Sequence, residues 1–195
     1  MEELHGLVVC GGQSSRMGKD KSLLDYHGLP QRDYLRALLT PFCNRVWISC
    51  NSSQAEMLTE DAMYIPDHEK FEGIGPMASL LSAFEKIPSA SFLVVGCDYP
   101  FVEGSHLQEL IASRWLANDA VCFRNPVSGY VEPLVAIYEN NISLLLTENF
   151  KQNKYSLRHL LGDANAKVIQ PASADFLTSV DDVAGYERAR QALHP

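Results

Sequence analysis

The chain of 195 residues lacks any apolar run near the roughly 20 residues that a transmembrane helix requires. Its first residues, MEELHG, also lack the basic segment followed by an apolar one that marks a secretory signal. Neither internal repeats nor low-complexity stretches interrupt the sequence. We therefore expect one soluble, cytoplasmic α/β domain that spans residues 1–195 and has no membrane partner.

Cysteine and histidine are present, but not at the spacings that metal or disulfide chemistry requires. The five cysteines are odd in number and form no C-x-x-C pair, which argues against a disulfide framework and against a zinc site. The six histidines include no H-E-x-x-H arrangement. Cys10, Cys50 and Cys97 stand at the ends of apolar runs, so we expect buried thiols that act as small hydrophobic groups rather than as nucleophiles.

Basic residues are too few for a protein whose main partner is nucleic acid. The chain has 16 Lys and Arg against 24 Asp and Glu, which gives a formal net charge of −8. Most of the excess lies between residues 51 and 150, where 14 acidic residues accompany only 4 basic ones. Because this field repels anions, an anionic substrate would depend on local cations near the N-terminus and on a magnesium ion.

Residues 7–21, LVVCGGQSSRMGKDK, have the layout of a phosphate-binding loop. Leu7–Val9 reads as a buried strand, and Gly11 and Gly12 allow a sharp turn that exposes backbone N–H groups. Three cations follow, namely Arg16, Lys19 and Lys21. The pattern matches neither G-x-x-x-x-G-K-[ST] nor G-x-G-x-x-G, and a simple turn followed by a solvated loop is the alternative reading.

The apolar pattern along the rest of the chain alternates between strand and helix. Strands are expected at residues 7–9, 45–50, 62–65, 92–96, 120–123 and 134–138. Helices are expected at residues 30–42, 76–87, 102–115, 142–150, 157–161 and 181–193. This succession predicts a Rossmann-like fold, in which a mainly parallel sheet has helices on both faces and a ligand crevice at the carboxyl ends of its strands.

Polar residues follow three of the expected strands. Asp98 comes after the apolar run FLVVG, where its carboxylate could hold Mg²⁺, although a turn before Pro100 would also explain it. Asp67 could accept hydrogen bonds from the N1–H and 2-amino groups of guanine, or it could form an Asx turn. Asn51 fits a nucleotide contact and a plain turn equally well.

Gly75 precedes Pro76 at an expected helix start. Bare N–H groups and the positive end of the helix dipole would face the crevice there. A flexible loop ahead of a helix is the rival explanation. The pattern is therefore compatible with a ligand contact without requiring one.

The segment VVCGGQSSRMGKDKSLL resembles the signature LAGGxSxRMGxxKxLL of the molybdenum cofactor guanylyltransferases, within the wider class of nucleotidyltransferases with the nucleotide-diphospho-sugar transferase fold. Further matches extend over most of the chain in the order of that family. They are Asn51, Asp67, the Gly75-Pro76-Met77-Ala78 run, Asp98 and Pro133-Leu134. The combination is far more specific than any one motif.

This resemblance implies an enzyme that transfers GMP from GTP to the phosphate of molybdopterin and releases pyrophosphate. It implies Mg²⁺ held by Asp98, and leaving phosphates bound by Arg16 and Lys21. The remaining nucleotide contacts that it implies are Val9, Cys10, Gly11, Gly12, Asn51, Asp67 and Gly75. Residues 1–100 would form the nucleotide-binding half and residues 101–195 the acceptor-binding half, with transient contacts to other proteins of molybdenum cofactor biosynthesis.

Three departures from the family pattern concern the substrates. Leu29 replaces a lysine, Ser79 replaces a glycine near the base, and the segment from Phe176 to Asp182 lacks two asparagines associated with the pterin-bearing substrate. Two alternatives therefore stay open. One is the same reaction with CTP or with a sugar 1-phosphate, and the other is a nucleotide-binding regulatory protein without turnover.

Overall fold

The protein is built on one seven-stranded sheet, in a computed structural model that describes residues 3–10, 20–51, 54 and 63–194. The strand order is β3-β2-β1-β4-β6-β5-β7, and within this sheet only β6 runs antiparallel to its neighbours. The strands are β1 (Leu4–Val9), β2 (Val46–Cys50), β3 (Tyr64–Pro66), β4 (Ser91–Gly96), β5 (Ala120–Arg124), β6 (Val131–Tyr138) and β7 (Ala166–Ile169). The predicted mainly parallel sheet is confirmed.

The central strands β1 and β4 are buried at every position. Successive side chains of a strand point to opposite faces, so a strand covered on both sides must be apolar throughout. Leu7 and Val9 accordingly belong to one hydrophobic cluster and Val8 to the other. The apolar runs of the sequence therefore place β1 and β4 in the middle of the sheet, where the strand order has them.

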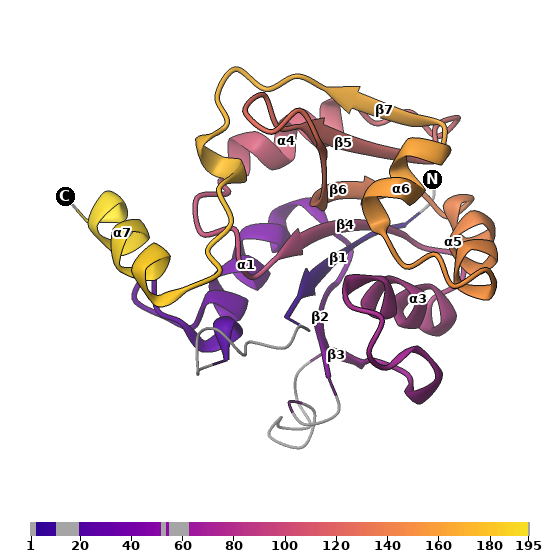
Figure 1. Ribbon diagram of the computed structural model, residues 1–195, viewed down its shortest axis with the longest axis horizontal. Coiled ribbons are helices and arrows are strands. Elements are labelled where there is room, and N and C mark those ends of the chain that lie inside the picture. Colours follow the sequence, from indigo (N-terminus) through magenta and orange to yellow (C-terminus); the bar gives the residue numbers. More distant parts are fainter. Residues whose placement is uncertain (1–2, 11–19, 52–53, 55–62, 195) are drawn as a thin grey trace.

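Helices cover both faces of this sheet (Figure 1). The helices α3 (Pro76–Lys86), α5 (Ile142–Lys151) and α6 (Leu157–Asp163) contribute apolar residues to the cluster on one face. The helices α1 (Gln31–Leu39) and α4 (Gly104–Ala112) do so on the other. Short 3₁₀ helices lie at Lys21–Leu23, Thr40–Phe42, Glu69–Phe71 and Asp175–Leu177. In the part of the chain that the structure describes, no helix is long and apolar enough to cross a membrane.

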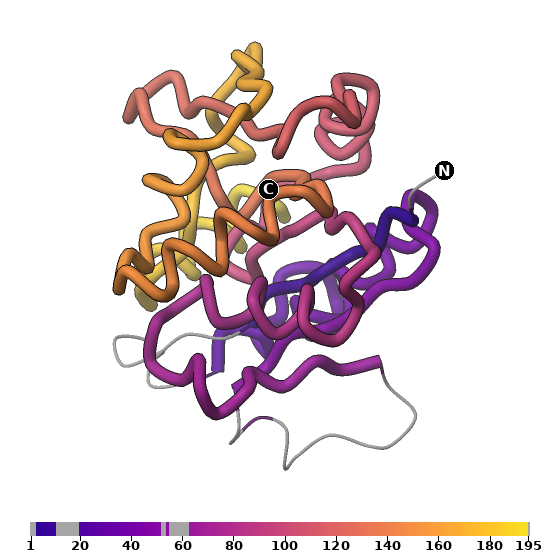
Figure 2. Tube along the Cα trace, turned by 90° about the vertical axis from the view of Figure 1, so that its right-hand side faces the viewer, coloured from indigo at the N-terminus to yellow at the C-terminus, as the bar shows by residue number. Residues whose placement is uncertain are grey.

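The last helix, α7 (Val183–Leu193), returns to the N-terminal part of the chain. It packs on the segment after Lys21–Leu23 in a small cluster that includes Tyr26 and Ala189. Tyr186 Oη donates to the Asp25 carbonyl at 3.0 Å, and His194 Nε2 contacts the Tyr26 carbonyl at 2.8 Å. Apart from this return, the strands up to β4 and those from β5 onward occupy opposite sides of the molecule (Figure 2).

Several predicted element boundaries were wrong. Strand β7 was not predicted, and three of its four residues are only half-buried, as expected at the edge of a sheet. The helix predicted at 102–115 is shorter, because Glu103 forms a capping box ahead of Gly104. Strand β6 begins before Pro133, although proline cannot donate to a strand ladder. A register shift in its pairing with β5 accommodates this proline.

Candidate functional site

Polar residues converge on the carboxyl edge of the four parallel strands β3, β2, β1 and β4. Asp67 follows β3, Asn51 follows β2 and Asp98 comes two residues after β4, as the sequence predicts. Val9 and Cys10 end β1 between them. Asp67 and Asp98 are thus three strand intervals apart, or about 14 Å at about 4.8 Å per interval, so they lie at opposite ends of this four-strand edge. Gly11, Gly12 and Arg16 lie outside the described residues.

Asp98 is the centre of a charged cluster at one end of this four-strand edge. Lys21 Nζ donates to Asp181 Oδ1 at 2.6 Å, and the Val180 amide donates to the Asp98 carbonyl at 2.8 Å. Burial raises the pKa of the Asp98 carboxyl to about 6. The charge of Lys21 opposes this rise in pKa, whereas Asp181 and Glu132 add to it. Lys21 therefore lies beside two carboxylates, a position compatible with its predicted role.

Gly96 provides the space that the Asp98 side chain occupies. A Cβ atom at position 96 would lie 2.6 Å from Asp98 Oδ1 and 3.2 Å from Leu134 Cβ. The first distance is shorter than real carbon–oxygen contacts, so any larger residue would displace the carboxylate. The sequence did not single out Gly96, because the requirement arises from a side chain that folds back over the strand end.

Lys21 is positioned by the short helix Lys21–Leu23. Asp20 caps this helix, since its Oδ1 accepts from the Ser22 amide at 2.9 Å. The other oxygen of Asp20 accepts from Gln54 Nε2 at 2.8 Å, and the same amide group contacts the Cys10 carbonyl at 3.5 Å. Gln54 thus joins the end of β1 to the segment that carries Lys21. It was not a predicted site residue, and no motif in the sequence marks it.

Asn51 has a structural role in the turn after β2, which the sequence allowed as the alternative to a nucleotide contact. Asn51 Oδ1 accepts from the backbone N–H of Gln54 at 2.9 Å, and the backbone N–H of Asn51 donates to Gln54 Oε1 at 3.0 Å. This reciprocal pair fixes the backbone where β2 ends. Asn51 therefore orders the edge of the crevice, and a contact with nucleotide would be an additional role.

Asp67 lies at the opposite end of the four-strand edge from Asp98. The hydroxyl groups of Ser49 and Ser79 both donate to Asp67 Oδ1 at 3.3 Å. Burial raises the pKa of Asp67 to about 6, and the two serine hydrogen bonds oppose that rise. Ser79, which replaces the glycine of the family pattern, is therefore one of two buried donors that orient this carboxylate.

Gly75 begins α3 in a conformation that only glycine adopts readily. Its φ of 70° and ψ of −150° lie in a region where a Cβ atom would clash with the backbone. Pro76 follows at the first helical position, where its missing N–H needs no partner. The predicted helix start at Pro76 is confirmed, and Ser79 near this end of α3 contacts Asp67.

The thiols near the site are not poised for nucleophilic chemistry. Cys10 and Cys97 are buried at the ends of adjacent strands, and all five cysteines are free. A hydrogen bond with Cys97 is the main cause that raises the pKa of Cys10, and burial raises it further. A thiol with a raised pKa stays protonated at neutral pH, so the expectation of buried, unreactive cysteines agrees with the structure.

A ready-made metal cage is not part of this arrangement. Among the described residues, no group of three His, Cys, Asp or Glu side chains could hold a metal ion. Mg²⁺ needs no such cage, because it commonly binds one or two carboxylates together with substrate phosphates. The oxygen donors of Asp98 are of the kind that this ion prefers.

Comparison with known proteins agrees with this geometry. Residues 6–169 match the family model described as a MobA-like NTP transferase domain. A probable molybdenum cofactor guanylyltransferase of Bacillus cereus is 28% identical over 200 residues, covering 99% of this chain and 98% of the relative. A molybdenum cofactor biosynthesis bifunctional protein of Synechocystis is 29% identical over 94% of this chain, which spans about half (52%) of that protein.

A solved structure confirms the fold. The crystal structure of molybdopterin-guanine dinucleotide biosynthesis protein A from Archaeoglobus fulgidus superposes with a TM-score of 0.80. The match covers 96% of this chain and 97% of the other, at 22% sequence identity. The similarity therefore extends over nearly the whole of both chains.

Proposed function

We propose that this chain, which belongs to the MobA-like NTP transferase domain family, transfers GMP from GTP to the terminal phosphate of molybdopterin. Pyrophosphate is the second product. The observation that carries the proposal is the cluster of Lys21 and Asp98 at the end of β4, which lies about 14 Å from Asp67 along the carboxyl edge of the sheet. A cation and a metal-binding carboxylate at one end and a nucleoside acceptor at the other suit a nucleoside triphosphate. The names of two relatives of nearly full matching length support GTP and molybdopterin as the substrates.

The base binds at the Asp67 end of the crevice. The carboxylate accepts from the N1–H and 2-amino groups of guanine, a pair of neighbouring donors that adenine and cytosine lack. Ser49 and Ser79 hold the carboxylate in place, and Gly75 at the start of α3 lets the backbone approach the ribose. Asn51 orders the strand end between base and phosphates.

The triphosphate binds along the end of β1. Val9 and Cys10 come directly before Gly11 and Gly12 in the chain, and we assign the binding of the phosphates to the backbone N–H groups of these two glycines. The positive charges of Arg16 and Lys21 bind the pyrophosphate that leaves. In the free protein Lys21 pairs with Asp181, so binding of the nucleotide exchanges a carboxylate partner for a phosphate.

Mg²⁺ is the ion that Asp98 would hold, and when bound it neutralises charge on the triphosphate oxygens. The acceptor phosphate itself is the nucleophile, so no side chain has to be activated. The role of the protein is to align the acceptor for in-line attack on the α-phosphorus and to stabilise the departing pyrophosphate. The raised pKa of Cys10 agrees with a thiol that takes no part.

The two halves of the sheet divide the substrates between them. Residues 1–100 bind the nucleotide, and residues 101–195 bind the acceptor. We place the protein in the cytoplasm, where it meets other proteins of molybdenum cofactor biosynthesis transiently. The division of the substrates follows the strand order, in which β3, β2, β1 and β4 form one side of the sheet and β6, β5 and β7 the other.

A calorimetric titration of GTP, CTP, ATP and UTP in the presence of Mg²⁺ tests the nucleotide assignment. GTP should bind at least tenfold more tightly than the other three, and Asp67→Asn should remove much of that preference, because a buried polar mismatch costs about 1–3 kcal/mol. Tighter binding of CTP would favour a cytidylyltransferase. Tight GTP binding without any turnover would favour the regulatory alternative.

A further inference from the structure

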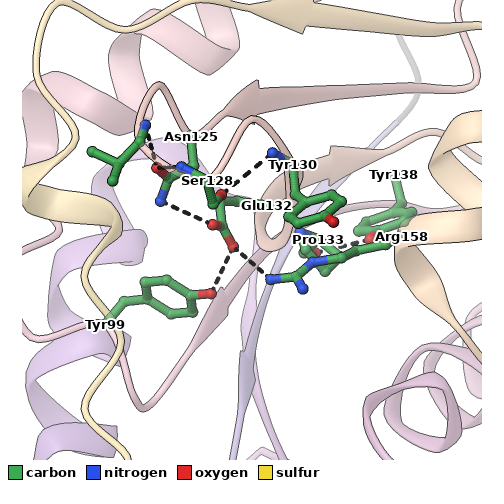
Figure 3. A network of polar contacts seen from close by, with 9 residues as sticks. Tyr99, Asn125, Ser128, Tyr130, Glu132, Pro133, Tyr138 and Arg158 are labelled. Atoms are coloured by element: carbon green, nitrogen blue, oxygen red, sulfur yellow. Dashed lines mark hydrogen bonds and ion pairs between the residues drawn. The ribbon is translucent and has the colours of Figure 1, made fainter.

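Glu132 of β6 is a buried carboxylate surrounded by partners from three separate segments (Figure 3). It is only 4% exposed. Tyr99 Oη donates to its Oε2 at 3.0 Å, Asn125 Nδ2 donates to its Oε1 at 3.2 Å, and Arg158 Nη2 lies 3.8 Å from Oε2. A buried carboxylate is costly unless it is paired, so this network fixes the positions of all its members.

Arg158 is the most exposed of these three partners of Glu132, since Tyr99 is buried and Asn125 is only partly exposed. Its side chain is 51% exposed, and its guanidinium carbon lies 5.5 Å from the ring centroid of Tyr130. Tyr130 is itself 63% exposed. The two side chains lie next to each other in Figure 3 and bring a planar ring and a planar cation together at the surface, and we call this pair the Tyr130–Arg158 shelf.

Glu132, which holds Arg158 of the shelf, is close enough to Asp98 for its charge to raise the pKa of that carboxyl. Tyr99, which binds Glu132, directly follows Asp98 in the chain. Leu134, two residues after Glu132, lies beside position 96. A Cβ atom at that position would be 3.2 Å from Leu134 Cβ and 2.6 Å from Asp98 Oδ1. Two residues span at most about 7 Å, so Glu132 lies near the proposed reacting centre. Because β6 is on the far side of β4 from β1, the shelf flanks Asp98 on the side away from Asp67.

A second arginine–glutamate pair shows what a purely structural contact looks like in this protein. Arg114 binds Glu139 through two short contacts, from Nε to Oε1 at 2.7 Å and from Nη2 to Oε2 at 2.8 Å. Its side chain is only 17% exposed. Glu139 follows the end of β6, at the edge of the sheet opposite the crevice. By contrast, Arg158 makes one longer contact with its glutamate and leaves half of its side chain exposed.

We propose that the Tyr130–Arg158 shelf is the docking surface for the acceptor, with Glu132 as the positioning residue that fixes Arg158. The inference rests on the proposed guanylyl transfer. An acceptor that joins a flat heteroaromatic ring to a phosphate matches the shelf, since the ring stacks on planar side chains and the guanidinium binds anionic substituents. A protein with a net charge of −8 needs such a local cation on its acceptor side as well as on its nucleotide side.

Steady-state release of pyrophosphate, with molybdopterin and GTP varied in turn, tests this inference. Tyr130→Ala and Arg158→Ala should each raise the KM for molybdopterin at least tenfold and change the KM for GTP less than twofold. Tyr130→Phe retains the ring and should therefore raise the KM for molybdopterin far less than Tyr130→Ala does. Arg158→Lys retains charge without the planar group and should still raise the KM for molybdopterin. Glu132→Gln should raise the same KM, because Arg158 loses its anchor.

Arg114→Lys is the matched control, since it weakens an arginine–glutamate pair at the other edge of the sheet and should leave both KM values unchanged. If Tyr130→Ala and Arg158→Ala fold like the wild type and leave the KM for molybdopterin unaltered, the inference is refuted. Equal increases in the KM for molybdopterin and the KM for GTP would also refute it. Should the alanine variants fold poorly, Arg158→Lys and Tyr130→Phe decide, and equal acceptor KM values for these two would refute it. If the wild type itself releases no pyrophosphate from GTP, the proposed function fails, independently of the variants.

Discussion

Replacing Asp98 by asparagine should stabilise the nucleotide-free protein while it abolishes turnover. The pKa of Asp98 is raised from 3.8 to about 6, mainly because burial disfavours the charged form. This difference corresponds to an unfolding free energy lower by up to about 3 kcal/mol when the group is ionised. Asparagine has nearly the same shape and carries no charge, so Asp98→Asn should recover much of that stability. Loss of the metal ligand should lower the rate at least about 10²-fold, since metal contributions are worth several kcal/mol.

The stabilisation expected of Asp98→Asn depends on pH. In the unfolded chain the carboxyl loses its proton near pH 3.8, and in the folded protein only near pH 6. Below pH 3.8 the group is neutral in both states and costs nothing, whereas above pH 6 the folded state must hold a charge in a poorly solvated place. Urea unfolding without nucleotide or Mg²⁺ should therefore show Asp98→Asn to be more stable than the wild type at pH 8, and nearly equal to it at pH 4.

Glu109→Gln, which removes one exposed carboxylate from α4, is the control and should change the unfolding free energy little at either pH. The account of Asp98 would be refuted if Asp98→Asn were no more stable than the wild type at pH 8, or if its advantage were the same at pH 4. Near-normal turnover of Asp98→Asn at saturating Mg²⁺ would refute its assignment as the metal ligand.

Three further outcomes are expected. Gly96→Ala should lower kcat at least tenfold, because its Cβ would lie 2.6 Å from Asp98 Oδ1, and near-normal kcat in a folded variant would contradict that requirement. The KM for GTP should rise as the pH falls through about 6, where the Asp67 carboxyl becomes protonated. Ser79→Ala should move the midpoint of this rise to higher pH, because it removes a hydrogen bond that lowers the pKa of Asp67. A KM for GTP that does not depend on pH would contradict both statements. Lys21→Ala should weaken GTP binding far more than guanosine binding by calorimetry, whereas equal losses would mean that Lys21 only supports its loop.

The sequence predicted the elements that are defined by local patterns. The apolar run at β4 and the Gly75-Pro76 start of α3 identify a buried strand and a helix without reference to the rest of the chain. The short edge strand β7 has no such signal, because half-exposed residues show neither strict alternation nor a continuous apolar run. Likewise, Pro133 concealed the first part of β6, which depends on a register shift in its pairing with β5.

The candidate site also contains residues that local sequence patterns predict and residues that they do not. The placement of Asn51, Asp67 and Asp98 at strand ends could be predicted because each comes within two residues of the end of an apolar run in the sequence. The residues that support them could not, because their partners are distant in the chain. Ser79 reaches Asp67 from a helix, and Glu132 reaches Tyr99 from another strand.

Transfer of GMP to molybdopterin can be followed in one assay. The purified protein is incubated with molybdopterin, Mg²⁺ and GTP labelled at the α-phosphorus, and the products are separated. The label should move into molybdopterin guanine dinucleotide, with one pyrophosphate released for each product formed, and Asp98→Asn should form none. Label that stays in GTP, or a wild-type protein that forms product only from CTP, would refute the proposed reaction.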